Sequence, residues 1–157
     1  MPHPRRARKD INRLIINSVG AYNWIHMAEP VFVGLLFADH IITEKNNKKG
    51  IIGTFSKFYA PRFPARFPPW HIYAAVTNLI GEHDFSINLV YDKAQQVIVP
   101  INGKIKVDEA SAVIELTFRI DGAMFPEEGK YILTFNVDGV QVGSRVLEVL
   151  TLPQSGG

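Results

Sequence analysis

Hydrophobic and polar residues alternate in short segments along the chain, and turn residues close most of these segments. The clearest example runs from Lys130 to Val137 and predicts a β-strand, in which successive side chains point to opposite faces. Its apolar side chains on one face are Tyr131, Leu133, Phe135 and Val137. Asp138-Gly139 follows directly, and both residues tolerate the positive φ that a tight type I′ hairpin turn requires. The pattern therefore predicts a strand that ends in a hairpin.

The same interpretation of the whole chain predicts about eight strands at even spacing. They are Val31–Ala38 (continuing toward Ile42), Ile51–Tyr59, Trp70–Thr77, Asp84–Asp92, Val97–Val107, Ala112–Ile120, Lys130–Val137 and Val140–Leu150. Regularly spaced short strands without helices between them are typical of an all-β protein with two packed antiparallel sheets. We therefore expect an immunoglobulin-like β-sandwich without a disulfide, in which Tyr131 forms a tyrosine corner with its hydroxyl bonded to the loop backbone.

Details of the strands predict how they are arranged. The first segment is apolar on both faces, which indicates a central strand, and the second segment is a candidate hairpin partner. A turn at Gly81-Glu82-His83 suggests a hairpin between the third and fourth strands. Pro100 has no N–H, so its strand is expected at a sheet edge, with a bulge or small hairpin at Asn102-Gly103. In the last strand the apolar phase switches near Gly143-Ser144, which predicts a bulge there.

The stretch between the second and third strands is unusual. It contains four prolines in Ala60–Pro69 and cannot form a long regular strand. Aromatic and basic residues are concentrated around it, and such side chains provide much of the energy at protein interfaces. The candidate partner-binding residues are Lys57, Tyr59, Arg62, Phe63, Arg66, Phe67 and Trp70. The alternative is that the aromatic rings close one end of the core and that the arginines are merely solvated.

Composition narrows the class of protein. A chain of 157 residues with 46% hydrophobic residues is long enough for one globular domain. It has no cysteine, so disulfides and thiolate chemistry are excluded, and a reducing cytoplasm would suit it. No apolar run is long enough to span a membrane as a helix. The net charge of +2 is too small to indicate nucleic-acid binding.

The first 26 residues differ from the remainder. They carry five basic groups against one acidic group, Asp10, a net charge of +4. Asp10 could cap a short helix with Ile11, Leu14, Ile15 and Val19 on one face. Three alternatives remain open: an ordered arm, a flexible basic tail, or translation that begins at Met27. We therefore expect an N-terminal extension at 1–26, a β-domain at 27–153 and a flexible tail at 154–157.

Several short motifs resemble a family of uncharacterised bacterial β-sandwich proteins. The first half contributes Leu36-Phe37-Ala38-Asp39, Ile52-Gly53-Thr54-Phe55 and Ala60-Pro61-Arg62-Phe63-Pro64. The second half contributes Phe125-Pro126-Glu127-Glu128-Gly129-Lys130-Tyr131 and Val137-Asp138-Gly139. The resemblance extends from about Val33 to Val149. It implies the fold and no activity, and it assigns no catalytic residue.

Motifs for catalysis, metal binding or cofactor binding are absent from the sequence, and no cofactor is expected. Histidines stand beside aspartates in Asp39-His40 and His83-Asp84, but neighbouring residues on a strand point to opposite faces. His71 and His83 are expected too far apart to share a metal ion. We therefore interpret the histidines as solvated or packed side chains.

Three functions remain as hypotheses. The first is a non-enzymatic interaction or accessory module that binds another protein through the proline-rich loop. The second is a module that binds a small ligand such as a carbohydrate. The third, an enzyme built on Asp39, His40 and His71, is the least favoured. A buried aromatic cluster would favour the first hypothesis or no site at all, an exposed flat row of aromatics the second, and clustering of those three residues the third.

Overall fold

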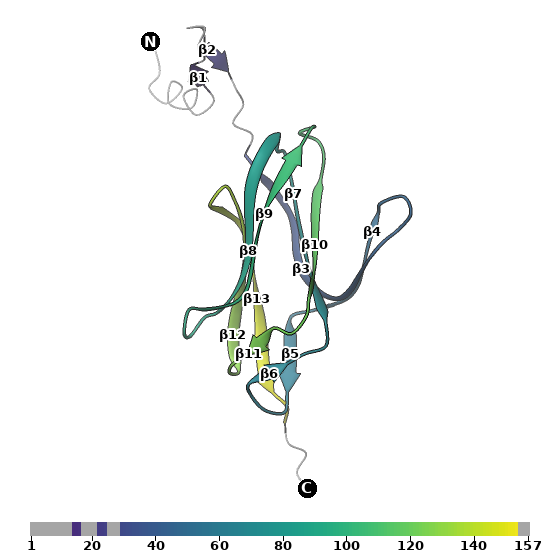
Figure 1. Ribbon diagram of the computed structural model, residues 1–157, viewed down its shortest axis with the longest axis vertical. Coiled ribbons are helices and arrows are strands. Elements are labelled where there is room, and N and C mark those ends of the chain that lie inside the picture. The colour runs from purple at the N-terminus through teal and green to yellow at the C-terminus, as the bar shows by residue number, and fades with distance from the viewer. Residues whose placement is uncertain (1–13, 17–21, 25–28, 154–157) are drawn as a thin grey trace, which may run out of the picture.

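The computed structural model describes residues 14–16, 22–24 and 29–153, and this part of the chain is all β, without a helix. A four-stranded sheet has the strand order β10-β7-β3-β4, and a five-stranded sheet has the order β5-β13-β12-β8-β9. Figure 1 shows the two sheets as layers, with β5, β6 and β11 together at the end near the C-terminus. Neighbouring strands are antiparallel, except that β5 is parallel to β13.

The bounds of the strands in the four-stranded sheet are β3 (Val31–Thr43), β4 (Lys49–Phe55), β7 (Trp70–Thr77) and β10 (Ile114–Ile120). Those in the five-stranded sheet are β5 (Lys57–Ala60), β8 (Gly81–Tyr91), β9 (Gln96–Val107), β12 (Gly129–Val137) and β13 (Val140–Thr151). Two further sheets have two strands each, and they are β1 (Leu14–Ile16) with β2 (Tyr22–Trp24), and β6 (Ala65–Arg66) with β11 (Met124–Phe125).

One core joins the two large sheets, and alternation of side chains along the strands produces it. On β12 the apolar residues predicted to share a face are all buried, and so are Phe85, Ile87, Leu89 and Tyr91 on β8. They pack with residues of the opposite sheet that include Leu35, Phe37, Ile72, Ala74 and Val76. The all-β class and the assignment of inward-facing residues on these strands are therefore confirmed.

The turn between β12 and β13 has the predicted conformation. Asp138 and Gly139 have φ angles of 51° and 79°, as a type I′ turn requires. The predicted bulge in β13 lies slightly earlier than Gly143-Ser144. Phe135 is opposite Gly143 whereas Asn136 is opposite Gln141, so Val142 is the extra residue.

The path of the chain differs from the prediction at two places, within the second predicted strand and between the third and fourth. The segment Ile51–Tyr59 is not one strand, because the chain changes sheets at Ser56: β4 pairs with β3, and β5 pairs with β13. The predicted hairpin near Gly81 is also wrong, because β7 pairs with β3 and β10 while β8 pairs with β9 and β12. In both cases a connection of one to three residues, Ser56 or residues 78–80, carries the chain from one large sheet to the other, and the local pattern does not reveal such a crossing.

β9 lies at the edge of its sheet, as its proline predicted. The bulge is wrongly placed, because the register shifts between Leu89 and Val90 and leaves Ile98 as the extra residue. As a result Val97, which the alternation predicts on the same face as the buried Val99, is 52% exposed. Gly103 lies in register opposite Phe85, and glycine is needed there because a Cβ atom would lie 2.6 Å from the ring of Phe85.

β3 is central, between β7 and β4, but it is fully covered over only part of its length. Leu35, Phe37 and Ala38 are buried, whereas Val31 is 50% exposed. The helix predicted in the leader is wrong where the structure describes it, because Leu14–Ile16 is a strand paired with β2. The other residues of that helix, Asp10, Ile11 and Val19, and the predicted tail at 154–157, lie outside the described residues.

Candidate functional site: the proline-rich loop and the opposite end of the sheets

The proline-rich loop leads from β5 through β6 to β7 at one end of the two large sheets (Figure 1). Its aromatic rings form an interlocking cluster on top of the core. The ring centroids of Phe58 and Phe67 are stacked 4.1 Å apart, and Phe58 meets Trp70 edge-on at 5.6 Å. Phe125, which is fully buried, lies 5.3 Å from Phe67. The cluster closes this end of the core and holds the loop in a fixed path.

The basic residues of the loop lie on its outer side. Arg62 and Arg66 are exposed and line a hollow of about 310 Å³ together with Tyr59, which is 49% exposed. Arg62 and Arg66 are the only charged residues among those that line this hollow. Within the described residues, neither guanidinium has a carboxylate within ion-pair distance. We call this surface the arginine hollow.

The structure therefore divides six of the seven predicted partner-binding residues into two groups. Trp70 is buried, and Phe63 and Phe67 are half-buried and pack against the core. Tyr59, Arg62 and Arg66 are exposed around the hollow. Lys57 is exposed but stands apart, opposite Glu148 in the pairing of β5 with β13. The exposed group is the one available to a partner.

Tyr131 forms the predicted corner beside this end of the core. Its hydroxyl donates to the backbone oxygen of Glu127 at 2.5 Å, and the ring is fully buried. The ring stacks on Tyr91 at 4.8 Å and meets Phe125 edge-on at 5.0 Å. Burial raises the pKa of Tyr131 to about 12. Tyr91 also binds this loop, because its hydroxyl donates to Glu127 Oε2 at 2.9 Å.

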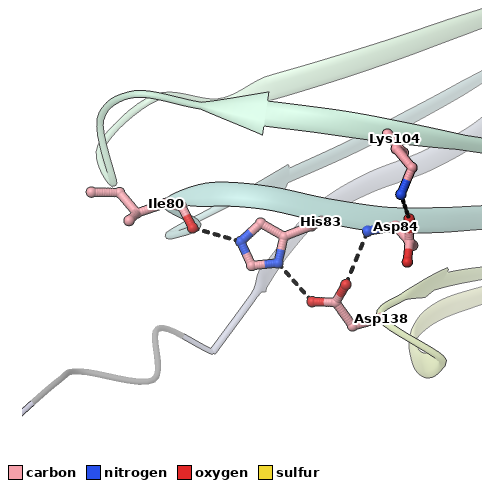
Figure 2. A network of polar contacts seen from close by, with 5 residues as sticks. All are labelled: Ile80, His83, Asp84, Lys104 and Asp138. Atoms are coloured by element: carbon pink, nitrogen blue, oxygen red, sulfur yellow. Dashed lines mark hydrogen bonds and ion pairs between the residues drawn. The ribbon is translucent and has the colours of Figure 1, made fainter. Parts of the chain in front are cut away.

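A second polar feature lies at the opposite end of the sheets, near the start of β8 (Figure 2). His83 Nδ1 is 2.6 Å from Asp138 Oδ2, and His83 Nε2 is 2.7 Å from the backbone oxygen of Ile80. The second oxygen of Asp138 accepts from the backbone N–H of Asp84 at 2.9 Å. Lys104 Nζ completes the network at 2.8 Å from Asp84 Oδ1.

The two partners in this network shift each other's ionisation. The hydrogen bond to Asp138 raises the pKa of His83 above its usual value of 6.5, and the bond to Ile80 adds to that effect. The hydrogen bond from His83 lowers the pKa of Asp138. The side chain of His83 is only 17% exposed. These contacts therefore favour the positively charged form of the ring, which lies against a carboxylate at the edge of the core.

This network was not predicted from the sequence, from which His83 was interpreted as a solvated or packed side chain. Two signals were present: a histidine at the start of a strand, and an aspartate in a type I′ turn at the end of another. The two residues are 55 positions apart in the chain. Only the antiparallel pairing of β8 with β12, which places Phe85 opposite Val137, brings them together.

The residues of the enzyme hypothesis come only partly together. His40 and His71 lie on adjacent strands with ring centroids 6.3 Å apart, and His71 Nδ1 is 3.0 Å from the backbone oxygen of Asp39. The side chain of Asp39 instead lies against Gly53 on β4. Across the described ranges, no group of three or more histidine, aspartate or glutamate side chains could hold a metal ion.

Comparison with known proteins identifies a family but no function. No curated protein matches the chain. The chain has a distant structural likeness to β-glucosidase from Listeria innocua in complex with isofagomine, with a TM-score of 0.43 at 9% identity over 83% of this chain and 17% of that one. It also has a likeness to the Pseudomonas fluorescens alkylpurine DNA glycosylase AlkC bound to DNA containing an abasic site analog, with a TM-score of 0.39 at 11% identity over 78% of this chain and 31% of that one.

The chain thus spans less than a third of the length of either structure, and at these TM-scores neither likeness bears on its function. No helix in the described residues is long and apolar enough to cross a membrane. One family model matches the chain over residues 34–150, which is most of its length. This range agrees with the resemblance expected from about Val33 to Val149. The chain therefore belongs to DUF6941, a family of unknown function.

Proposed function

We propose that this chain is a non-enzymatic interaction module with an immunoglobulin-like β-sandwich fold, and that it binds an acidic segment of a partner protein at the arginine hollow. The fold proposal is supported by the two large sheets, their shared core and the tyrosine corner. The binding proposal depends on one observation above all. Two exposed arginines line one hollow with an exposed tyrosine, and no carboxylate lines it.

The chemistry of the hollow suits an acidic partner. Arginine binds carboxylates through paired N–H groups, and such charge-assisted bonds are roughly twice as strong as neutral ones. Tyr59 adds an amphipathic surface of the kind enriched at interfaces. The packed aromatic cluster beneath the loop fixes the backbone between the two arginines, so less conformational freedom is lost on binding.

The arrangement of the aromatic residues supports an interaction module over a carbohydrate-binding module. Sugar stacking needs exposed ring faces, and the rings of Phe58, Phe67 and Trp70 pack against one another and the core. Tyr59 is the exposed aromatic residue of the hollow. A single ring beside two guanidinium groups fits a peptide with carboxylates better than a flat sugar platform.

The test compares two variants of the full chain with equal charge. The first carries Arg62→Ala and Arg66→Ala, and the matched control carries Lys45→Ala and Lys48→Ala in the turn between β3 and β4. The first measurement is binding of a synthetic peptide that alternates glutamate and leucine. The second is affinity capture of partners from native lysate, identified by mass spectrometry. Each substitution is on the surface, so the free energy of unfolding should change by less than about 0.5 kcal/mol.

We expect the arginine variant to bind the peptide at least about tenfold more weakly than the unchanged chain, since two charge-assisted bonds are worth more than 1.4 kcal/mol together. The lysine control should bind normally. Partners captured by the unchanged chain and by the control, but lost from the arginine variant, would support the proposal. Equal weakening of both variants would show that the peptide responds only to net charge, and the proposal would be wrong.

A further inference from the structure

The His83 network has a property that follows from its atoms alone. A neutral imidazole has one N–H group and one nitrogen that only accepts. Both partners of His83, the oxygen of Ile80 and Oδ2 of Asp138, are acceptors at hydrogen-bonding distance. Only the protonated ring can donate to both of them. The observed geometry therefore requires the charged form of His83.

The surrounding charges leave Asp138 as the group that controls the ring. Asp138 contacts it from the turn between β12 and β13. The other charged groups nearby, on β8 and the adjacent β9, are Glu82, Asp84, Lys104 and Lys106. They oppose each other in two cross-strand pairs, and the Lys104–Asp84 pair is in direct contact at 2.8 Å. The charges of these two pairs largely offset each other at the ring, and Glu29, which precedes β3 and lines the same hollow as Asp138, is a further carboxylate at this end of the sheets.

His83 ties the connection between the two large sheets to a turn of the five-stranded sheet. Ile80 lies in the connection between β7 and β8, and Asp138 lies in the turn between β12 and β13. The same connection anchors the start of β3, because Asn78 Nδ2 donates to the backbone oxygen of Glu29 at 2.8 Å. A hollow of about 570 Å³ opens beside these contacts, and its lining includes Glu29, Leu79 and Asp138.

We propose that His83 is a pH-sensitive clasp: its protonated ring ties the β7–β8 connection to the β12–β13 turn, and loss of the proton frees the connection at Ile80 and loosens the wall of the adjacent hollow. The device is independent of the arginine hollow, whose lining residues belong to β5, β6 and the adjoining loop. Figure 1 shows β5 and β6 at the other end of the sheets.

The chemistry predicts which contact breaks. When the ring loses one proton, the remaining N–H stays on Nδ1, where it donates to the charged carboxylate of Asp138, the stronger acceptor. Nε2 then presents a lone pair to the oxygen of Ile80, and two acceptors repel each other at this distance. The connection Asn78–Ile80 is therefore the segment that moves, and the turn at Asp138 stays in place.

The pH direction follows from the raised pKa of His83. The contact with Ile80 is complete below about pH 6.5, the value for an ordinary histidine, and it is lost as the pH rises through the folded-state pKa of His83. The pKa of Asp138 is lowered, so Asp138 keeps its negative charge until the pH falls below the usual carboxyl range. The clasp is therefore closed below about pH 6.5 and opens as the pH rises through the folded-state pKa of His83.

The first measurement is a nitrogen-15 NMR titration of the histidine rings in the full chain. At pH 6 both ring nitrogens of His83 should carry protons, and its titration midpoint should lie above 6.5. In alkaline solution the proton should remain on Nδ1. A His83 ring that is neutral at pH 6, or that keeps its proton on Nε2 instead, would overturn the proposal.

The second measurement follows hydrogen exchange of the backbone in residues 78–82, corrected for the intrinsic effect of pH. Protection should fall across the His83 midpoint. Asp138→Asn removes the charge but keeps the turn, because asparagine tolerates the same positive φ. This variant should lower the His83 midpoint and shift the loss of protection by the same number of pH units. His40→Gln, an exposed control on β3, should leave both unchanged. The clasp would be refuted if, in the unchanged chain or in the Asp138→Asn variant, protection were lost at a pH that does not coincide with the His83 midpoint.

Discussion

Replacing Tyr131 by phenylalanine removes one oxygen atom from the edge of the core and leaves the ring in place. The ring is fully buried between Tyr91 and Phe125, so its packing should survive the change. The hydroxyl donates to the backbone oxygen of Glu127 at 2.5 Å and lies 3.4 Å from the backbone nitrogen of the same residue. The substitution therefore tests the corner contact alone.

The expected magnitude follows from this geometry. A hydrogen bond of this kind contributes about 1 kcal/mol, and the cost rises toward about 3 kcal/mol when a buried partner is left unpaired. Glu127 is exposed, so after the substitution water can hydrate part of its backbone oxygen and lower the cost of the lost bond. We therefore expect a loss of about 1–2 kcal/mol in the free energy of unfolding. For a chain of this size that corresponds to about 3–6 °C in the unfolding midpoint.

Denaturant unfolding of the full chain, followed by circular dichroism, is the assay. Tyr59→Phe is the matched control, because Tyr59 is 49% exposed and its hydroxyl makes no hydrogen bond with the described residues. The control should change the free energy of unfolding by less than about 0.5 kcal/mol. If Tyr131→Phe were as silent as the control, the hydroxyl would contribute nothing to the corner, and the argument from its contact with Glu127 would be wrong.

Further predictions concern the core, a turn and alkaline pH. Phe125→Ala should cost about 3–5 kcal/mol in urea unfolding, because the ring is fully buried in the aromatic cluster, and half-buried Phe63→Ala should cost less. Gly139→Ala should cost about 1–2 kcal/mol from backbone strain alone, since φ is 79° and a Cβ atom would contact nothing, and Gly139→Asn should cost less in the same assay. Unfolding measured against pH should show a stability contribution that is lost between about pH 10 and pH 12, and Tyr131→Phe should reduce it because the folded-state pKa of Tyr131 is raised to about 12, while Tyr73 and Tyr91, whose pKa values are also raised, keep their share.

The agreement between prediction and structure is best where one strand can be interpreted without its neighbours. The alternation from Tyr131 to Val137 places those side chains in the core, and the dipeptide Asp138-Gly139 specifies the turn. The tyrosine corner could also be predicted, because Tyr131 and Glu127 are only four residues apart. Local geometry controls each of these features.

The arginine hollow could be predicted only in part. The sequence shows that basic and aromatic residues are concentrated in the loop. It does not show which of their side chains are buried, because the loop has no regular alternation of inward and outward side chains. Packing decided it: Trp70 and Phe67 joined the core cluster, whereas Arg62, Arg66 and Tyr59 stayed at the surface. Whether a loop ring is buried depends on Phe125, which lies more than 50 residues further along the chain.

By itself the sequence determined the all-β class, most of the strands and which side chains share a face, since a period of two is a property of each strand's backbone. The tertiary structure decided which strand pairs with which. It divided one predicted strand at Ser56 and replaced a predicted hairpin near Gly81, and at both places the chain crosses between sheets. It also joined His83 to Asp138. Pairing depends on the burial of whole sheet faces against each other, and that energy is shared by residues far apart in the chain, so no short segment of sequence contains it.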